Sequence, residues 1–135
     1  MQKETIIDTE LATLWYYPKE KIVHHKFHKY IYGDALHQIL EAGVDLLIKN
    51  RACKWLSDDR NSAAMTKADS EWSAQEWRPK AIKSGWRYWA VIVPRSVTGK
   101  MSYNLLAERY KETVVEMKFF EDTKSGLIWL SSLKD

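Results

Sequence analysis

The chain has only one cysteine, three prolines and five glycines in 135 residues. Because Cys53 is alone, no disulfide can form within the chain, and we expect it to be a small buried core residue. The longest apolar run, residues 89–94, is far shorter than the ~20 residues that span a bilayer. Residues 1–5 lack the basic and apolar segments of a secretory signal. These absences predict a cytoplasmic protein without a transmembrane segment.

The charge balance is also weak, with a net charge of +3. Nucleic-acid binders concentrate more positive charge than this, so nucleic acid is not the expected partner. The apolar fraction of 45% is ordinary for a globular protein, and a chain of this length can bury about two thirds of its surface. We therefore predict a single domain over residues 1–135 that needs no cofactor. Aromatic residues are in excess, with seven Trp and seven Tyr.

The first half of the chain predicts a hairpin followed by a helix. Residues 11–17 and 22–28 are rich in strand formers and are separated by the polar turn 18–21. A helix is expected from Gly33 to Asn50, because apolar residues recur there at spacings of three and four. Gly43 lies on that apolar face, which predicts a close approach to the sheet.

The second half alternates between strand and helix patterns. Strands are expected at 52–56, 86–93 and 114–120. Helices are expected at 66–84 with a kink at Pro79, after an N-cap at Ser102, and after Asp122 or Thr123. Such alternation requires parallel strands with right-handed crossovers. The predicted fold class is α/β, with a single mixed sheet (an antiparallel hairpin, then parallel strands) and about four helices.

This element order resembles the STAS fold and the smaller CRAL-TRIO lipid-binding domains. Three segments look more like a group of small uncharacterised bacterial proteins of that fold. They are Lys-Trp-Leu-Ser-Asp-Asp-Arg-Asn at 54–61, the Glu-Trp and Trp-Arg-Pro of 71–79, and Gly-Trp-Arg-Tyr-Trp-Ala at 85–90. The resemblance implies a single STAS-like domain over the chain.

The resemblance also implies a regulatory switch, because STAS antagonists of anti-sigma factors are phosphorylated on a Ser that follows an Asp. Here Ser57 precedes Asp58 and Asp59, and the next serine is Ser62. A phosphate beside two carboxylates would meet like-charge repulsion. Ser57 and Ser62 are therefore candidate phosphorylation sites that depart from the family pattern.

The residues Ser57, Asp58, Asp59, Arg60 and Asn61 form the first candidate binding site. They follow a central strand, and open α/β sheets bind ligands at the carboxyl ends of their strands. The structural alternative is that one Asp caps the following turn while the other pairs with Arg60.

The tryptophans Trp72, Trp77, Trp86 and Trp89 form the second candidate feature, together with basic residues. The basic residues of this segment are Arg78, Lys80, Lys83 and Arg87. Together they predict an aromatic pocket with a cationic rim, suited to an amphipathic anion. The alternatives are tryptophans that simply pack in the core, and a surface that stacks unpaired bases.

The histidines do not predict a metal site. In a strand His24 and His28 would share a face about 13 Å apart, with His25 facing away, so we expect solvated hairpin histidines. No catalytic residue is predicted either, because no Ser-His-Asp motif is present and no His lies within a dozen residues of the 57–61 loop.

The sequence thus predicts a non-enzymatic binding or regulatory module. A small amphipathic ligand would lie between the 57–61 loop and the 69–84 helix, with Trp72, Trp77 and Trp86 covering its apolar body. One alternative is a protein-interaction adaptor that uses the same helix face. Another is a small enzyme with Asp58 or Asp59 as base. A homodimer through the hairpin edge is a further expectation, because an unpaired edge strand favours pairing.

Overall fold

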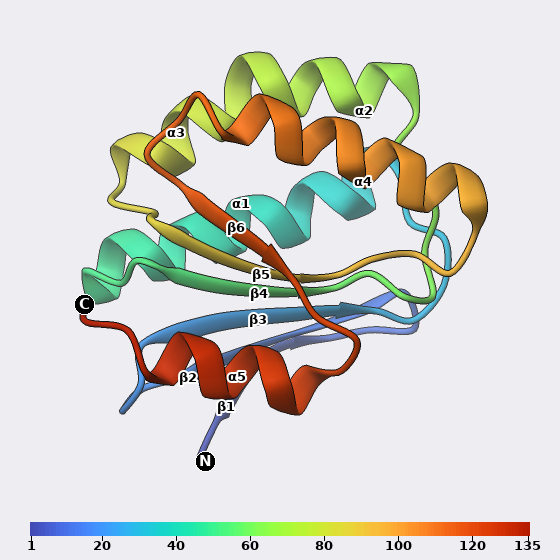
Figure 1. The fold of residues 1–135 in the computed structure, drawn as a ribbon. Helices are drawn as coiled ribbons and strands as arrows, with labels where there is room; N and C mark the ends of the chain where they lie inside the picture. Colours follow the sequence, from blue (N-terminus) through green and yellow to red (C-terminus); the bar gives the residue numbers. More distant parts are fainter.

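The computed structural model describes residues 1–135 as one six-stranded sheet in the order β1-β2-β3-β4-β5-β6 (Figure 1). The strands are β1 (Glu4–Asp8), β2 (Ala12–Tyr17), β3 (Ile22–Phe27), β4 (Lys54–Asp58), β5 (Tyr88–Ile92) and β6 (Glu116–Phe119). β1, β2 and β3 pair antiparallel, whereas β3, β4, β5 and β6 pair parallel. The predicted mixed α/β sheet is therefore confirmed.

Helices cover both faces of this sheet (Figure 1). The helical segments are α1 (Gly33–Asn50), α2 (Lys67–Trp72), the π-helical turn η1 (Ser73–Trp77), α3 (Arg78–Lys83), α4 (Val97–Tyr110) and α5 (Thr123–Ser131). Figure 1 shows α5 alone on one face and the other helices on the opposite face. None of these helices is long and apolar enough to cross a bilayer.

The strand β1 was not expected from the sequence. Four of its five residues are exposed, so it lacks the apolar alternation by which a strand is recognised. It pairs with β2 and so covers the outer edge of the predicted hairpin. The hairpin edge on which the expected homodimer was based is therefore not unpaired, because it is already hydrogen-bonded within the chain.

Two boundaries also differ from the sequence-based expectation. Ser57 and Asp58 belong to β4 and not to a loop, because Ser57 pairs in register with His25 on one side and Val91 on the other. The N-cap of α4 is Ser96, whose side chain accepts the backbone N–H of Gly99, and not Ser102.

The predicted break at Pro79 takes the form of a π-helical turn. The backbone N–H of Arg78 donates to the carbonyl of Ser73, five residues back, and Pro79 then lies in the first turn of α3. A proline is tolerated there because the first helical N–H groups have no intrahelical acceptor. Residues 67–83 thus remain one continuous helical segment. Single π turns inside helices occur frequently at functional sites.

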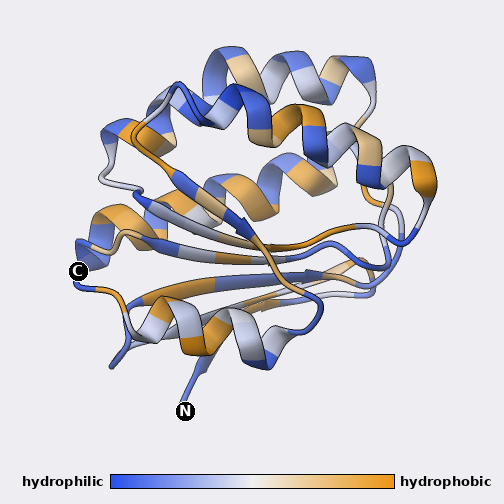
Figure 2. Cartoon of the chain, in the orientation of Figure 1, coloured by the Kyte–Doolittle hydropathy of each residue, from blue (hydrophilic) through white to orange (hydrophobic).

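The larger apolar core lies on the side of α1, α3 and α4, and Figure 2 shows apolar and polar bands alternating along α1. Its largest fully buried side chains include Trp55 and Trp86. Gly43 in α1 faces Trp55 directly, as predicted: a Cβ built on Gly43 would lie 2.0 Å from Cη2 of that indole. Cys53 is buried, also as predicted.

Asp69 connects α2 to the start of α1. Its carboxylate accepts the backbone N–H of Gly33 at 2.9 Å and Nε2–H of His37 at 2.9 Å, while its own N–H donates to Thr66 Oγ1. Burial opposes the charge, but these hydrogen bonds outweigh burial and lower the pKa of Asp69.

We expect Asp69→Ala to lower the free energy of unfolding by about 2 kcal/mol, because two donors lose their acceptor. Glu71→Ala in the same helix is the control, since Glu71 is exposed and is expected to change stability by less than about 0.5 kcal/mol. Urea unfolding at neutral pH measures both. Equal effects of the two substitutions would contradict this role of Asp69.

Candidate functional site

A cavity of about 180 Å³ lies between the sheet and the helices that cover its larger core. Side chains of β3, β4 and β5 form its floor, and the segment from α2 to α3 and the helix α4 form its walls. Its aromatic lining consists of Phe27, Trp55, Trp77, Trp89, Tyr103 and Tyr110. The cavity lies where the sequence predicted a ligand, with α4 as an additional wall.

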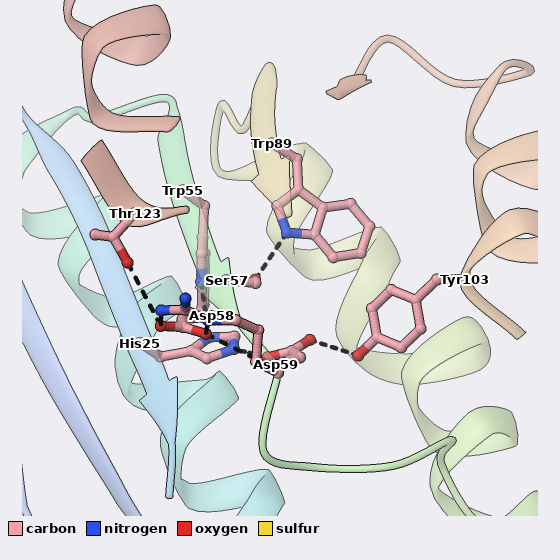
Figure 3. A network of polar contacts seen from close by, with 9 residues as sticks. His25, Trp55, Ser57, Asp58, Asp59, Trp89, Tyr103 and Thr123 are labelled. Carbon is pink, nitrogen blue, oxygen red and sulfur yellow. Dashed lines mark hydrogen bonds and ion pairs between the residues drawn. The ribbon is translucent and has the colours of Figure 1, made fainter. Parts of the chain in front are cut away.

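The floor holds a buried chain of hydrogen bonds (Figure 3). The indole N–H of Trp55 donates to His25 Nδ1 at 3.0 Å, and His25 Nε2 lies 2.7 Å from Asp59 Oδ1. The Tyr103 hydroxyl donates to the other carboxylate oxygen of Asp59. Because Nδ1 accepts from Trp55, the ring proton of neutral His25 is on Nε2 and is donated to Asp59.

This network is not a catalytic triad, although it brings Ser57, His25 and Asp59 to one cavity. Both nitrogens of His25 are already engaged, so neither can accept a proton from the Ser57 hydroxyl. Ser57 Oγ instead accepts the indole N–H of Trp89 at 2.8 Å, and its own hydroxyl hydrogen has no protein acceptor. Burial and the Asp59 carboxylate raise the pKa of Tyr103 well above its usual value, so Tyr103 stays a donor.

Further polar groups lie on the helix side of the cavity. Ser73, the first residue of η1, is only 8% exposed and its hydroxyl has no hydrogen-bond partner. Arg78 stacks its guanidinium 4.7 Å from the ring centroid of Tyr110, and its buried Nε also has no partner. Neither Arg78 nor the exposed Arg109 forms a salt bridge. The cavity therefore has unused donors and two arginines without an acidic partner, together with the one carboxylate of Asp59.

The eight predicted site residues do not form one site. Ser57, Asp59 and Trp77 line the cavity. Asp58 and Arg60 lie on the opposite side of the sheet, because successive residues of a strand point to opposite faces. There Arg60 binds Asp58 through two hydrogen bonds, at 3.0 and 2.8 Å, and the Thr123 hydroxyl lies 3.4 Å from the same carboxylate (Figure 3).

The other three predicted residues lie outside the cavity lining. Asn61 is exposed, Trp86 is fully buried in the core, and Trp72 stacks on His37 at a centroid distance of 3.7 Å. The cationic rim is also reduced to one of its four predicted residues, Arg78, since the other three side chains are exposed elsewhere. Of the two candidate phosphorylation sites, Ser57 is buried and Ser62 is half-buried.

Sequence reasoning missed His25, Ser73 and Tyr103. His24 and His25 are buried, so the expectation that both are solvated is wrong. His25 belongs to the site because β3 pairs parallel with β4. This pairing places His25 beside Ser57, although the two are 32 residues apart in the chain. Nothing in the local pattern of 97–110 indicated that Tyr103 would reach Asp59.

His24, on the other face of β3 from His25, predicts a pH effect. Burial is the main reason why the pKa of His24 is lowered to about 3. Unfolded histidine titrates near ~6.5, so below this pH the unfolded chain binds a proton that the folded chain excludes. Stability is therefore lost as pH falls.

Between pH 8 and pH 5 we expect the wild type to lose about 2 kcal/mol more stability than His24→Phe. The phenyl ring retains the packing of His24 against Trp15 and Tyr17. His28→Phe is the control, because His28 is only half-buried and its removal leaves the effect of His24 in place. Denaturant unfolding at several pH values measures the slopes, and parallel slopes for wild type and His24→Phe would contradict the prediction.

Comparison with known proteins shows similarity in fold. No protein-family model matches the chain, and no curated protein matches it. A solved structure that is similar is that of an uncharacterised protein of the DUF3478 family from Shewanella loihica PV-4, described as having a SpoIIAA-like fold. The two share 14% sequence identity with a TM-score of 0.53, over 96% of this chain and 92% of the other. This chain therefore has a SpoIIAA-like, STAS-like α/β fold, as its sequence predicted.

Proposed function

We propose that this protein is a non-enzymatic binding module that holds a small amphipathic ligand in the cavity between its sheet and α4. The observation that carries the proposal is Arg78, which lines the cavity and whose buried Nε has no hydrogen-bond partner. A buried polar group without a hydrogen bond costs about 1–3 kcal/mol, so a ligand that satisfies it gains that amount.

The size of the cavity limits the ligand. A cavity of ~150 Å³ accommodates benzene, so about 180 Å³ accommodates one ring with a few further atoms. Aromatic side chains form much of the wall, and few precisely placed polar groups among apolar walls are typical of small-molecule sites. Ser57 and Ser73 supply unused hydroxyl hydrogens, and Asp59 has lone pairs beyond the two that His25 and Tyr103 use.

The experiment fills the cavity and measures retention of small molecules. Wild type, Ser73→Met and Gln75→Met are each equilibrated with a small-molecule cell extract, washed and analysed by native mass spectrometry. Ser73→Met places a long apolar side chain in the cavity, whereas Gln75 is an exposed residue of the same π-helical turn and is the matched control. Circular dichroism verifies that all three proteins are folded.

We expect wild type and Gln75→Met to retain the same added mass and Ser73→Met to lose it. Equal retention by folded Ser73→Met would place the ligand elsewhere. A bare mass for all three proteins would contradict a ligand-binding function.

A second candidate function is self-association through α4. Val97, Met101 and Leu105 recur at a spacing of four and are 73%, 61% and 63% exposed, which leaves an apolar stripe along this helix. Exposed apolar patches mark interaction sites. Light scattering after size exclusion tests it: a dimer that becomes monomeric in Met101→Lys would support self-association, and a monomeric wild type would exclude it.

A further inference from the structure

We infer that the ligand of the cavity is a single-ring aryl carboxylate with a hydroxyl group opposite its acid. The inference rests on the proposed function and adds the chemical class and orientation of the ligand. The cavity bears two kinds of polar group at different depths. His25, Ser57 and Asp59 are each at most 3% exposed and form the deep end, whereas Arg78 is half-buried and Arg109 is exposed.

The outer end of the cavity fits an anion. Arg78 and Arg109 both line the cavity and neither has an acidic partner. The Nε of Arg78 is buried without an acceptor, although the guanidinium is held against Tyr110. A guanidinium binds a carboxylate through two parallel hydrogen bonds, and it is most effective when packing has already oriented it. A carboxylate beside Arg78 would supply the missing acceptor.

The deep end fits a neutral hydroxyl group. Ser57 Oγ already accepts from Trp89, so its hydroxyl can donate to a ligand oxygen. The Asp59 carboxylate offers about four acceptor positions, of which His25 and Tyr103 use two. A ligand hydroxyl can accept from Ser57 and donate to Asp59. A second ligand carboxylate at this depth would be repelled by Asp59, so the acid lies outward.

The space between the two ends fits a planar ring. Trp77 and Trp89 line the cavity from opposite layers, one from η1 and the other from β5. Aromatic rings pack favourably against each other in offset or edge-to-face arrangements, beyond the effect of buried area alone. The cavity volume of about 180 Å³ accommodates one ring with two small substituents.

Isothermal titration calorimetry with three probes tests this class. The probes are 4-hydroxybenzoate, benzoate without the hydroxyl, and 4-hydroxybenzyl alcohol without the acid. We expect 4-hydroxybenzoate to bind wild type about tenfold or more tightly than either analogue, since each analogue loses a hydrogen-bonded group. Arg78→Gln should remove the preference for the acid over the alcohol. Lys80→Gln, the same charge change at an exposed residue outside the cavity lining, should retain it.

The outcomes separate the two proposals. If the alcohol binds as tightly as the acid, or if Arg78→Gln and Lys80→Gln behave alike, the assignment of the carboxylate to Arg78 is wrong while the cavity remains a binding site. If benzoate equals 4-hydroxybenzoate, the hydroxyl assignment is wrong. If none of the three compounds binds wild type, the ligand class is overturned, and the proposed function falls with it if wild type also retains no mass from the cell extract.

Discussion

Replacing Gly43 by alanine is expected to destabilise the protein by about 3 kcal/mol or more, although alanine is the better helix former. A Cβ at this position would lie 2.0, 2.5 and 2.8 Å from three carbons of the Trp55 ring. Trp55 is fully buried between α1 and the core, so its ring cannot move aside without displacing other side chains. The steric cost therefore exceeds the ~1 kcal/mol that alanine contributes within a helix.

Two variants test the cause of this effect. Gly126→Ala is the same substitution in α5, where the nearest atom is the flexible end of Leu56 at 2.8 Å, and we expect a smaller loss. Trp55→Phe removes the ring carbons that the new Cβ would meet, so the Gly43→Ala and Trp55→Phe double variant should be more stable than the sum of the single losses predicts. Additive losses measured by denaturant unfolding would show that the contact is not the cause.

Removing the Asp59 carboxylate is expected to cost about 3–5 kcal/mol in Asp59→Ala. The carboxylate accepts from His25 and from Tyr103, and both donors are buried. The substitution leaves the N–H of His25 and the O–H of Tyr103, both buried, without an acceptor. Denaturant unfolding at neutral pH measures the loss.

Asp59→Asn retains the shape of the Asp59 side chain but removes its charge, so it separates the effects of the two. Its carbonyl oxygen can accept from His25, and its amide can donate to the Tyr103 oxygen, so we expect a loss of only about 1 kcal/mol. A charged His25 would instead make Asp59→Asn nearly as damaging as Asp59→Ala, and such a result would contradict the hydrogen-bond pattern derived from Trp55.

Asp58→Ala is the neighbouring control for both Asp59 variants. Burial opposes its charge, but the Arg60 hydrogen bonds outweigh burial and lower the pKa of Asp58. Arg60 is half-exposed and can return to water, so we expect Asp58→Ala to cost less than Asp59→Ala.

The Gly43 contact and the Asp59 network are linked through one side chain. Trp55 packs against α1 because Gly43 has no Cβ, and from that position its indole N–H reaches His25 Nδ1. The tautomer of His25, and hence its donation to Asp59, depends on this placement. Gly43→Ala therefore also perturbs the floor of the cavity.

The fold was predictable from the sequence where local periodicity carries the information. The apolar spacing of 33–50 identified α1 and the close approach at Gly43, and the order of strands and helices indicated a mixed sheet. β1 could not be predicted because it buries almost no apolar side chain and is specified by pairing with β2.

The site was only partly predictable because it depends on long-range register. Asp58 and Asp59 are adjacent in sequence, but the start of the strand had to be known before their opposite directions could be derived. His25 reaches Asp59 through the pairing of β3 with β4, and Tyr103 reaches it from α4. No spacing within either segment reveals these contacts.

The most direct test of the central claim, that the cavity takes a ring-sized ligand, is the indole N–H spectrum by nuclear magnetic resonance during titration with phenol. Trp55, Trp77 and Trp89 line the cavity, whereas Trp15 and Trp129 lie outside its lining. We predict saturable shifts of the first three indole signals, with the last two unchanged. Unchanged signals of all three cavity tryptophans at saturating phenol would contradict the claim.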